Sequence, residues 1–171
     1  ERIAEIESRY DPNTVWYRRD ILGERAVAEG LIYQLFADQP ELFVVDELPR
    51  IQRATIGVDF GGGTSAHAFC AMGFTTGGAL VVLDEYREKS ALTPEKLARD
   101  FVDFVRRCQA NWLVTDCFCD SAEQTLINGL RTAAARDGVG LNIGHAQKRP
   151  INDRIRALCL LMGADRFVIN R

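Results

Sequence analysis

Two acidic residues stand where apolar stretches of the sequence give way to turns. Asp59 comes just before the glycine-rich turn 61–65, and Glu85 comes near the end of a later apolar stretch. The pattern predicts a meander of three antiparallel strands, at residues 55–60, 67–74 and 79–86. The first and third strands of such a meander run parallel, so we expect Asp59 and Glu85 at the same edge of the sheet.

Carboxylates held at one edge repel each other, and a bound cation is the usual reason to keep such a pair. Oxygen ligands of this kind bind hard divalent cations. The alternative, from this stretch alone, is that Asp59 and Glu85 are separately solvated residues with no joint role.

A further acidic pair follows another apolar stretch. Residues 112–116 predict a strand ending in Asp116, and Asp120 follows shortly afterwards at the expected start of a helix. We expect the strand to continue between them, because leaving the intervening apolar residues wet would cost free energy. Alternation then places Asp116, Phe118 and Asp120 on one face, with Asp120 at the rim facing Asp59. Asp116 would lie deeper, where it needs a hydrogen-bonding partner or a raised pKa.

Composition limits the class of protein. The 171 residues are 47% hydrophobic and 26% charged, which suffices for one α/β core and not for two large domains. The net charge of −3 argues against a strongly basic domain that coats nucleic acid, but not against an enzyme whose acidic site binds cations. The five cysteines and two histidines lack the spacing of a zinc site. No apolar run is long enough to span a bilayer, so we expect no membrane association.

The rest of the chain alternates helices and strands. Thr93 and Pro94 predict the start of a helix that runs to Gln109, and further helices are expected from residue 120 to Gly138 and from residue 150 to Gly163. Additional strands are expected at residues 31–36, 43–45, 141–143 and 167–169. The face of the last helix expected to be buried consists of Ile151, Ile155, Leu158, Cys159 and Met162.

This order of elements predicts an α/β, ribonuclease H-like fold, in which a mixed central sheet of antiparallel meander and parallel strands is flanked by helices. Phosphodiester hydrolysis by two cations about 3.5–4 Å apart requires several carboxylates at one edge of a sheet. Asp59 with Asp116 or Asp120 is placed for that chemistry. Lys148, Arg149 and Arg154 lie near a loop expected at the same edge and could bind DNA phosphates. The alternative for these three is ordinary surface charge.

Five stretches in order resemble the nuclease domain of the large terminase subunit of tailed bacteriophages. They are Leu22-Gly23-Glu24, residues 29–33 with Phe36, residues 57–61, Glu85-Tyr86 and residues 120–124. The resemblance implies an endonuclease dependent on Mg²⁺ or Mn²⁺ that cleaves double-stranded DNA concatemers during genome packaging in the host cell cytoplasm. It also implies three partners: a terminase ATPase domain earlier in the full chain, the small terminase subunit and the portal protein.

The resemblance also suggests roles for individual residues. Asp59 and Asp120 match the first and second metal-binding aspartates of the family, and Glu85 matches an acid found before tyrosine. Asp116 stands where the family has an apolar strand end, so it competes with Asp120 for the role of ligand. Asp153, at the start of the last helix, is the topological candidate for a further ligand; the alternative is an acid that interacts favourably with the helix dipole.

The family's last catalytic aspartate lies beyond a further hairpin that this sequence does not reach. We therefore expect residues 31–171 to form a nuclease domain without its C-terminal end. Residues 1–30 are expected to be a connecting segment that follows the ATPase domain.

Two other functions start from the same residues. The glycines after Asp59 resemble the phosphate loop of actin-like and sugar-kinase ATPases, in which backbone N–H groups bind phosphate. That superfamily places two such domains around a nucleotide, and the length of this sequence provides one. The other alternative is a non-catalytic docking domain that has the fold without the chemistry.

Overall fold

The computed structural model describes residues 31–61, 65–89, 92–120 and 123–171. The chain divides into two compact units, Glu1–Leu42 and Phe43–Arg171. The boundary expected after residue 30 stays a prediction, because the expected connecting segment 1–30 lies outside the described residues. The described part of the first unit contains helix α3 (Gln34–Asp38) and the 3-10 helix η1 (Pro40–Leu42).

The strand predicted at residues 31–36 is wrong, because residues 34–36 lie in helix α3 and residues 31–33 precede it without forming a strand. The N–H of Ala37 donates to the carbonyl of Tyr33 at 3.1 Å, and the side chain of Gln34 donates to Asp38 at 2.8 Å. A short apolar run does not distinguish a strand from a helix by its periodicity. Local hydrogen bonds to residues four positions away are satisfied here without a neighbouring strand.

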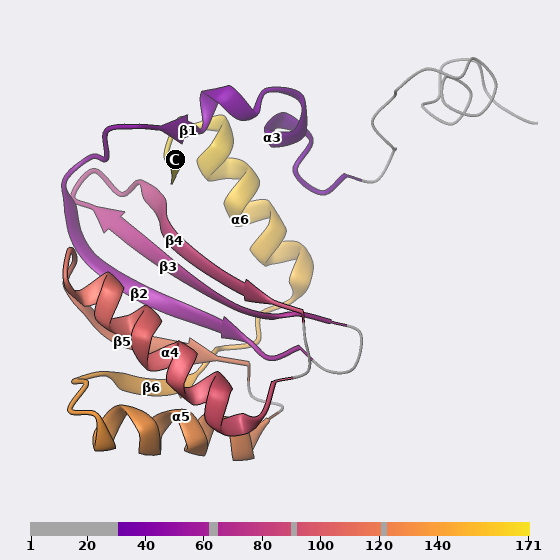
Figure 1. Cartoon of the computed structure of the whole chain (residues 1–171). Coiled ribbons are helices and arrows are strands. Elements are labelled where there is room, and N and C mark those ends of the chain that lie inside the picture. The colour runs from indigo at the N-terminus through magenta and orange to yellow at the C-terminus, as the bar shows by residue number, and fades with distance from the viewer. Residues whose placement is uncertain (1–30, 62–64, 90–91, 121–122) are drawn as a thin grey trace, which may run out of the picture. The chain divides into compact units, whose positions relative to one another are not determined.

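The second unit is built on a mixed sheet (Figure 1). Its strands are β1 (Val44–Val45), β2 (Ile51–Asp59), β3 (His67–Thr75), β4 (Leu80–Glu88), β5 (Val114–Cys119), β6 (Asn142–His145) and β7 (Phe167–Asn170). Among the described residues the order across the sheet is β1-β7-β4-β3-β2-β5-β6. The antiparallel meander β2-β3-β4 is confirmed, and parallel strands extend it on both sides. β2 therefore pairs with β3 on one side and with β5 on the other.

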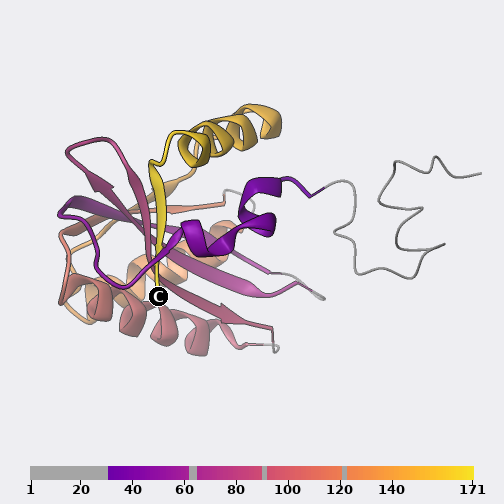
Figure 2. The same ribbon diagram turned by 90° about the horizontal axis from the view of Figure 1, so that it is seen from above.

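Helices cover both faces of this sheet. α4 (Pro94–Gln109) and α5 (Gln124–Arg136) lie on one face, and α6 (Ile151–Gly163) lies on the other (Figures 1 and 2). The predicted start of α4 is confirmed, because the N–H of Lys96 donates to the hydroxyl oxygen of Thr93 at 3.3 Å. None of the described helices is long and apolar enough to cross a membrane.

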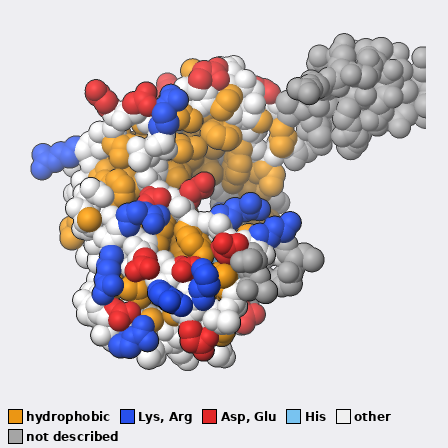
Figure 3. All heavy atoms as spheres, in the orientation of Figure 1, with side chains coloured by type: hydrophobic (Ala, Val, Ile, Leu, Met, Phe, Trp, Pro, Cys, Tyr) orange, Lys and Arg blue, Asp and Glu red, His pale blue; other side chains and the backbone are white. Residues whose placement is uncertain are grey.

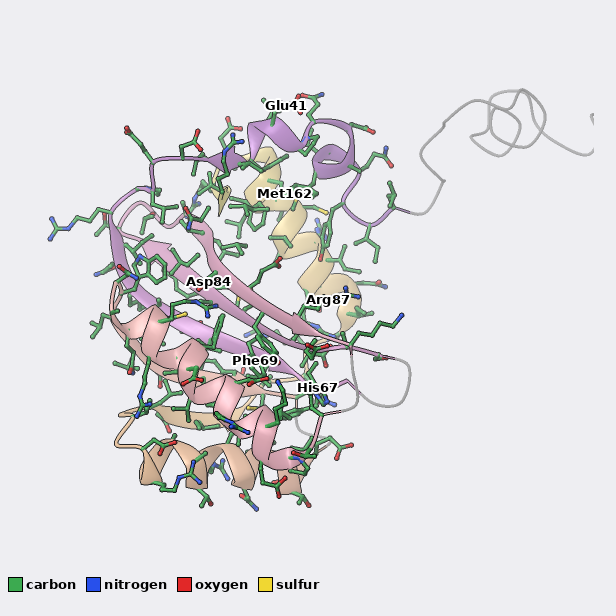
Figure 4. The ribbon with its side chains drawn as sticks, in the orientation of Figure 1. Glu41, His67, Phe69, Asp84, Arg87 and Met162 are labelled. Carbon is green, nitrogen blue, oxygen red and sulfur yellow. The ribbon has the colours of Figure 1, made fainter. Side chains whose placement is uncertain are left out.

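The core lies between the sheet and α4. Side chains of β2 that point toward α4 are buried, among them Ile56 and Val58. Phe69 of β3 is stacked on Tyr86 with ring centroids 4.6 Å apart and meets Phe101 of α4 edge-on at 5.5 Å. Figure 4 shows Phe69 on this side of the sheet. Because alternate residues of a strand point to opposite faces, this packing leaves Gly57 and Asp59 on the face opposite α4.

The buried face predicted for α6 is only partly confirmed, since Ile155 and Leu158 are half-buried. Met162 is buried, whereas Ile151 is 61% exposed and Cys159 is exposed. Helical periodicity identifies an apolar face, but burial also requires a surface that packs against it. Met162, near the C-terminal end of α6, is the residue of this helix that is buried. Figure 2 shows α6 on the face of the sheet opposite α4.

Candidate active site

The site is built where β2 and β5 end side by side. Val58 of β2 pairs with Cys119 of β5 in parallel register, and the N–H of Asp120 donates to the carbonyl of Val58 at 3.1 Å. The ladder thus continues one residue beyond β5. Asp59, the last residue of β2, and Asp120, the residue after β5, therefore lie at the same edge of the sheet.

Both aspartates line one cavity of about 600 Å³ on the face of the sheet opposite α4. The sheet contributes its floor, including Gly57, Cys70, Met72 and Phe118. Lys148 and Arg154 line it from the segment that leads into α6 and from the first turn of that helix. The cavity therefore combines two carboxylates, two basic side chains and an apolar floor.

The ammonium group of Lys148 lies 2.9 Å from Oδ1 of Asp120. One backbone hydrogen bond anchors the segment that carries this lysine to the end of β5, and a second bond is local to the segment. The N–H of Ala146 donates to the carbonyl of Cys119 at 2.9 Å, and the N–H of Arg149 donates to that of Gln147 at 3.1 Å. The structure thus brings Lys148 and Arg154 to the acidic edge. Arg149 is exposed and is not among the residues that line the cavity.

Asp116 does not line the cavity, although it is on the same face of β5 as Phe118. The hydroxyl of Thr115 donates to it at 2.8 Å, and the side-chain amide of Asn142 on β6 donates to it at 3.0 Å. These hydrogen bonds lower the pKa of Asp116. The expected hydrogen-bonding partner is present, and a raised pKa is not needed. The hydrogen bond from Asn142 to Asp116 therefore links β6, the last strand of the sheet order, to β5.

Glu85 of β4 lies on the cavity face of the sheet but outside the lining of the cavity. Cys70 of β3 pairs with Glu85 on one side and with Gly57 on the other, so a full strand separates Glu85 from β2. Burial, and after it the charge of Glu85, raises the pKa of the Cys70 thiol. The neighbouring Asp84 points to the α4 side, where Arg107 donates to it at 2.6 Å (Figure 4).

Asp153 is exposed in the first turn of α6 and does not line the cavity, although Arg154 beside it does. Among the described residues no group of three or more His, Cys, Asp or Glu side chains could hold a metal ion. Asp59 and Asp120 are therefore the two candidate ligands that the described residues bring to one cavity.

Sequence reasoning missed the apolar floor of the cavity. Phe118 was expected to avoid water, yet it is 43% exposed, and it lines the cavity together with Met72. The alternation along β5 already placed Phe118 on the face of Asp120, which was the available signal.

The face covered by α4 and α5 has a different character. Figure 3 shows Lys, Arg, Asp and Glu side chains intermixed there, so that face does not present a field of one sign.

Comparison with known proteins shows the class of fold. No protein-family model and no curated protein matches the sequence. The nuclease domain of the P22 large terminase matches with a TM-score of 0.62 at 16% identity, over 84% of this chain and 73% of that one. The g2p large terminase nuclease domain of bacteriophage SPP1, solved with bound Mn, matches with a TM-score of 0.53 at 25% identity, over 71% of this chain and 62% of that one.

The HK97 bacteriophage large terminase matches with a TM-score of 0.54 at 15% identity, over 77% of this chain and 33% of that one. The second unit accordingly has a ribonuclease H-like fold, as the order of its elements predicted. Over most of its length the chain matches the nuclease domains of phage large terminases in structure. It spans about a third of the HK97 chain.

Proposed function

We propose that this chain is a metal-dependent endonuclease domain that cleaves double-stranded DNA during phage genome packaging. The observation that carries the proposal is the placement of Asp59 and Asp120 at the ends of neighbouring parallel strands, in one cavity. The bound Mn in the SPP1 nuclease domain supports the choice of cation. The match to terminase structures supports DNA as the substrate, with the terminase ATPase domain, the small subunit and the portal protein as partners.

The residues of the cavity fit Mg²⁺ or Mn²⁺. Carboxylate oxygens are the ligands these ions prefer, and Mg²⁺ is often held by one or two carboxylates while several waters complete its shell. The ammonium of Lys148 lies 2.9 Å from Oδ1 of Asp120, which supports a site that favours positive charge at that oxygen. When bound, such ions activate a water for attack and stabilise the leaving oxygen of the phosphodiester.

The side chains of the chain have separate tasks in this proposal. Asp59 and Asp120 hold the ions, and their charges keep the ions at the edge of the sheet. Lys148 and Arg154 bind phosphates of the DNA backbone, which positions the duplex without reading its sequence. Asp116 stabilises the pairing of β5 with β6 and does not contact the substrate, because its carboxylate accepts hydrogen bonds from Thr115 and Asn142.

Cleavage of supercoiled plasmid with and without Mn²⁺ tests the proposal. The chain should nick and linearise plasmid with Mn²⁺, and Asp59→Asn should abolish this while leaving the fold intact. Asp103→Asn is the matched control, because Asp103 is exposed on α4, on the other face of the sheet. Cleavage by Asp59→Asn at the rate of the unmodified chain would refute the proposed site.

Metal titration separates this function from the two alternatives. Binding of Mn²⁺ without nucleotide supports the nuclease, binding that requires nucleotide supports an ATPase, and no binding supports a docking domain.

One of the glycines that suggested a phosphate loop also has a structural reason to be glycine. A Cβ atom on Gly61 would lie 2.4 Å from the backbone oxygen of Ser65, so the chain passes too close to itself there for a side chain. Residues 62–64 lie outside the described residues.

A further inference from the structure

Lys148 makes the ion pair nearest to the candidate metal site. Its Nζ lies 2.9 Å from Oδ1 of Asp120, inside the cavity that Asp120 shares with Asp59. The position is fixed by the backbone on the N-terminal side, since the N–H of Ala146 bonds to Cys119 at the end of β5. The same strand end therefore presents the carboxylate and anchors the segment that carries its counter-ion.

An ammonium group and a metal ion compete for such an oxygen. A divalent ion bound to Asp120 would repel a positive charge kept at contact distance, and the repulsion grows as the distance shortens. Lys148 is exposed and Asp120 is partly exposed, with 61% and 46% of their side-chain surface accessible, although Oδ1 of Asp120 itself is covered. Ion pairs between exposed side chains are weak, so this pair opens readily.

We propose that Lys148 is an internal counter-ion that is exchanged for metal at Asp120, an inference that rests on the proposed function. In the metal-free protein, Lys148 offsets the charge of Asp120 beside Asp59. Once the carboxylate binds a divalent cation, the ammonium swings away on its flexible stem and is available to a DNA phosphate at the same cavity. Metal and DNA then favour each other's binding, because each takes one partner of the ion pair and makes the other partner available to the second ligand.

The chain provides a matched control for this role. Arg149 follows Lys148 directly and carries the same charge, yet it does not line the cavity. A general effect of removing positive charge near the site should appear in both Lys148→Ala and Arg149→Ala. An effect of the ion pair should appear only in Lys148→Ala, and only while the carboxylate of Asp120 is present.

The test is Mn²⁺ affinity measured by isothermal titration calorimetry on the whole chain without DNA. Lys148→Ala should bind Mn²⁺ about three- to fivefold more tightly than the unmodified chain, a range set by the strength of exposed ion pairs. Arg149→Ala should leave the affinity unchanged. In the Asp120→Asn background, titrated at Mn²⁺ concentrations high enough to follow weaker binding through Asp59, the further change Lys148→Ala should have no effect, which is the result that identifies the partner of Lys148.

The outcomes separate this inference from the proposed function. If the unmodified chain binds no Mn²⁺, the proposed function fails and the inference fails with it. If the unmodified chain binds Mn²⁺ and Lys148→Ala binds it equally or more weakly, the inference alone is overturned. An equal gain in Lys148→Ala and Arg149→Ala would also overturn it, because net charge would then account for the change.

Discussion

The N–H of Asp120 donates to the carbonyl of Val58 at 3.1 Å, one residue beyond the last residue of β5. This bond extends the parallel pairing of β2 and β5 to the point where both strands carry an aspartate. Parallel strands end at the same edge of a sheet, so the spacing of Asp59 and Asp120 is set by backbone pairing and not by a loop. The two carboxylates can then be held close without depending on the neighbouring segment 121–122, which lies outside the described residues.

Asp120 and Asp116 should respond differently to the same substitution. Asp120→Asn should abolish plasmid cleavage in Mn²⁺, because a ligand of the cavity is lost. Asp116→Asn should retain cleavage, because Asp116 is outside the cavity and bonds to Thr115 and Asn142. Cleavage assays alongside thermal unfolding check both results. If a folded Asp116→Asn lost cleavage while Asp120→Asn retained it, Asp116 would be the metal ligand in place of Asp120.

Basic residues at the cavity should govern the salt dependence of DNA binding. Lys148→Ala and Arg154→Ala should each lower the slope of log K against log salt by about 0.9 per lost phosphate contact. Arg149→Ala should leave the slope unchanged, since Arg149 does not line the cavity. Fluorescence anisotropy with a short duplex over a range of salt concentrations measures the slopes. If all three variants had the same slope, Lys148 and Arg154 would be ordinary surface charges with no special contact to DNA phosphates.

The hydrogen bond from Asn142 to Asp116 should contribute stability that depends on pH. The folded-state pKa of Asp116 is lowered, first by the bond from Thr115 and then by that from Asn142. A lowered pKa contributes stability above the unfolded value of about 3.9, and this contribution is lost as the pH falls through the folded-state pKa. Asn142→Ala should therefore be less stable than the unmodified chain near pH 6. Urea unfolding should show the difference shrinking below about pH 4, and a constant difference at every pH would contradict the assignment.

Two phenylalanines give a matched test of the core. Phe69 is 1% exposed between Tyr86 and Phe101, whereas Phe118 is 43% exposed at the cavity. Phe69→Ala should lower the free energy of unfolding by about 3–5 kcal/mol, because it removes a buried ring and leaves a cavity. Phe118→Ala should lower it by less than about 1 kcal/mol. Urea unfolding measures both, and similar losses would mean that the ring of Phe118 is covered.

Regular local patterns explain which elements were predictable. The apolar stretches of β2, β3 and β4, separated by glycine-rich turns, specify a meander, and Thr93 with Pro94 specifies the start of α4. Alternation along β5 puts Cys117 and Cys119 on the face opposite Asp120, and both are fully buried. In each case the short-range pattern and the tertiary structure favour the same conformation.

Features that depend on a partner surface were not predictable in the same way. The apolar run at residues 31–36 has the composition of a strand, but part of it forms helix α3. Similarly, Ile151 has the helical spacing of a buried residue and is exposed. At the site, the strand ends identified Asp59 and Asp120, but nothing in the sequence separated Lys148 from Arg149. That distinction depends on the path of the backbone between β6 and α6, which is anchored by the bond from Ala146 to Cys119.

The most direct test of the proposed metal-dependent nuclease is anomalous diffraction from a crystal of this chain soaked in Mn²⁺. We predict a Mn²⁺ peak in the cavity between β2 and β5, with carboxylate oxygens of Asp59 and Asp120 about 2.0–2.6 Å from the bound ion or from a close pair of ions. We also predict that Lys148 no longer contacts Asp120 in that crystal. Full Mn²⁺ occupancy elsewhere on the protein, with the Asp59 and Asp120 carboxylates ligating no ion, would contradict the account.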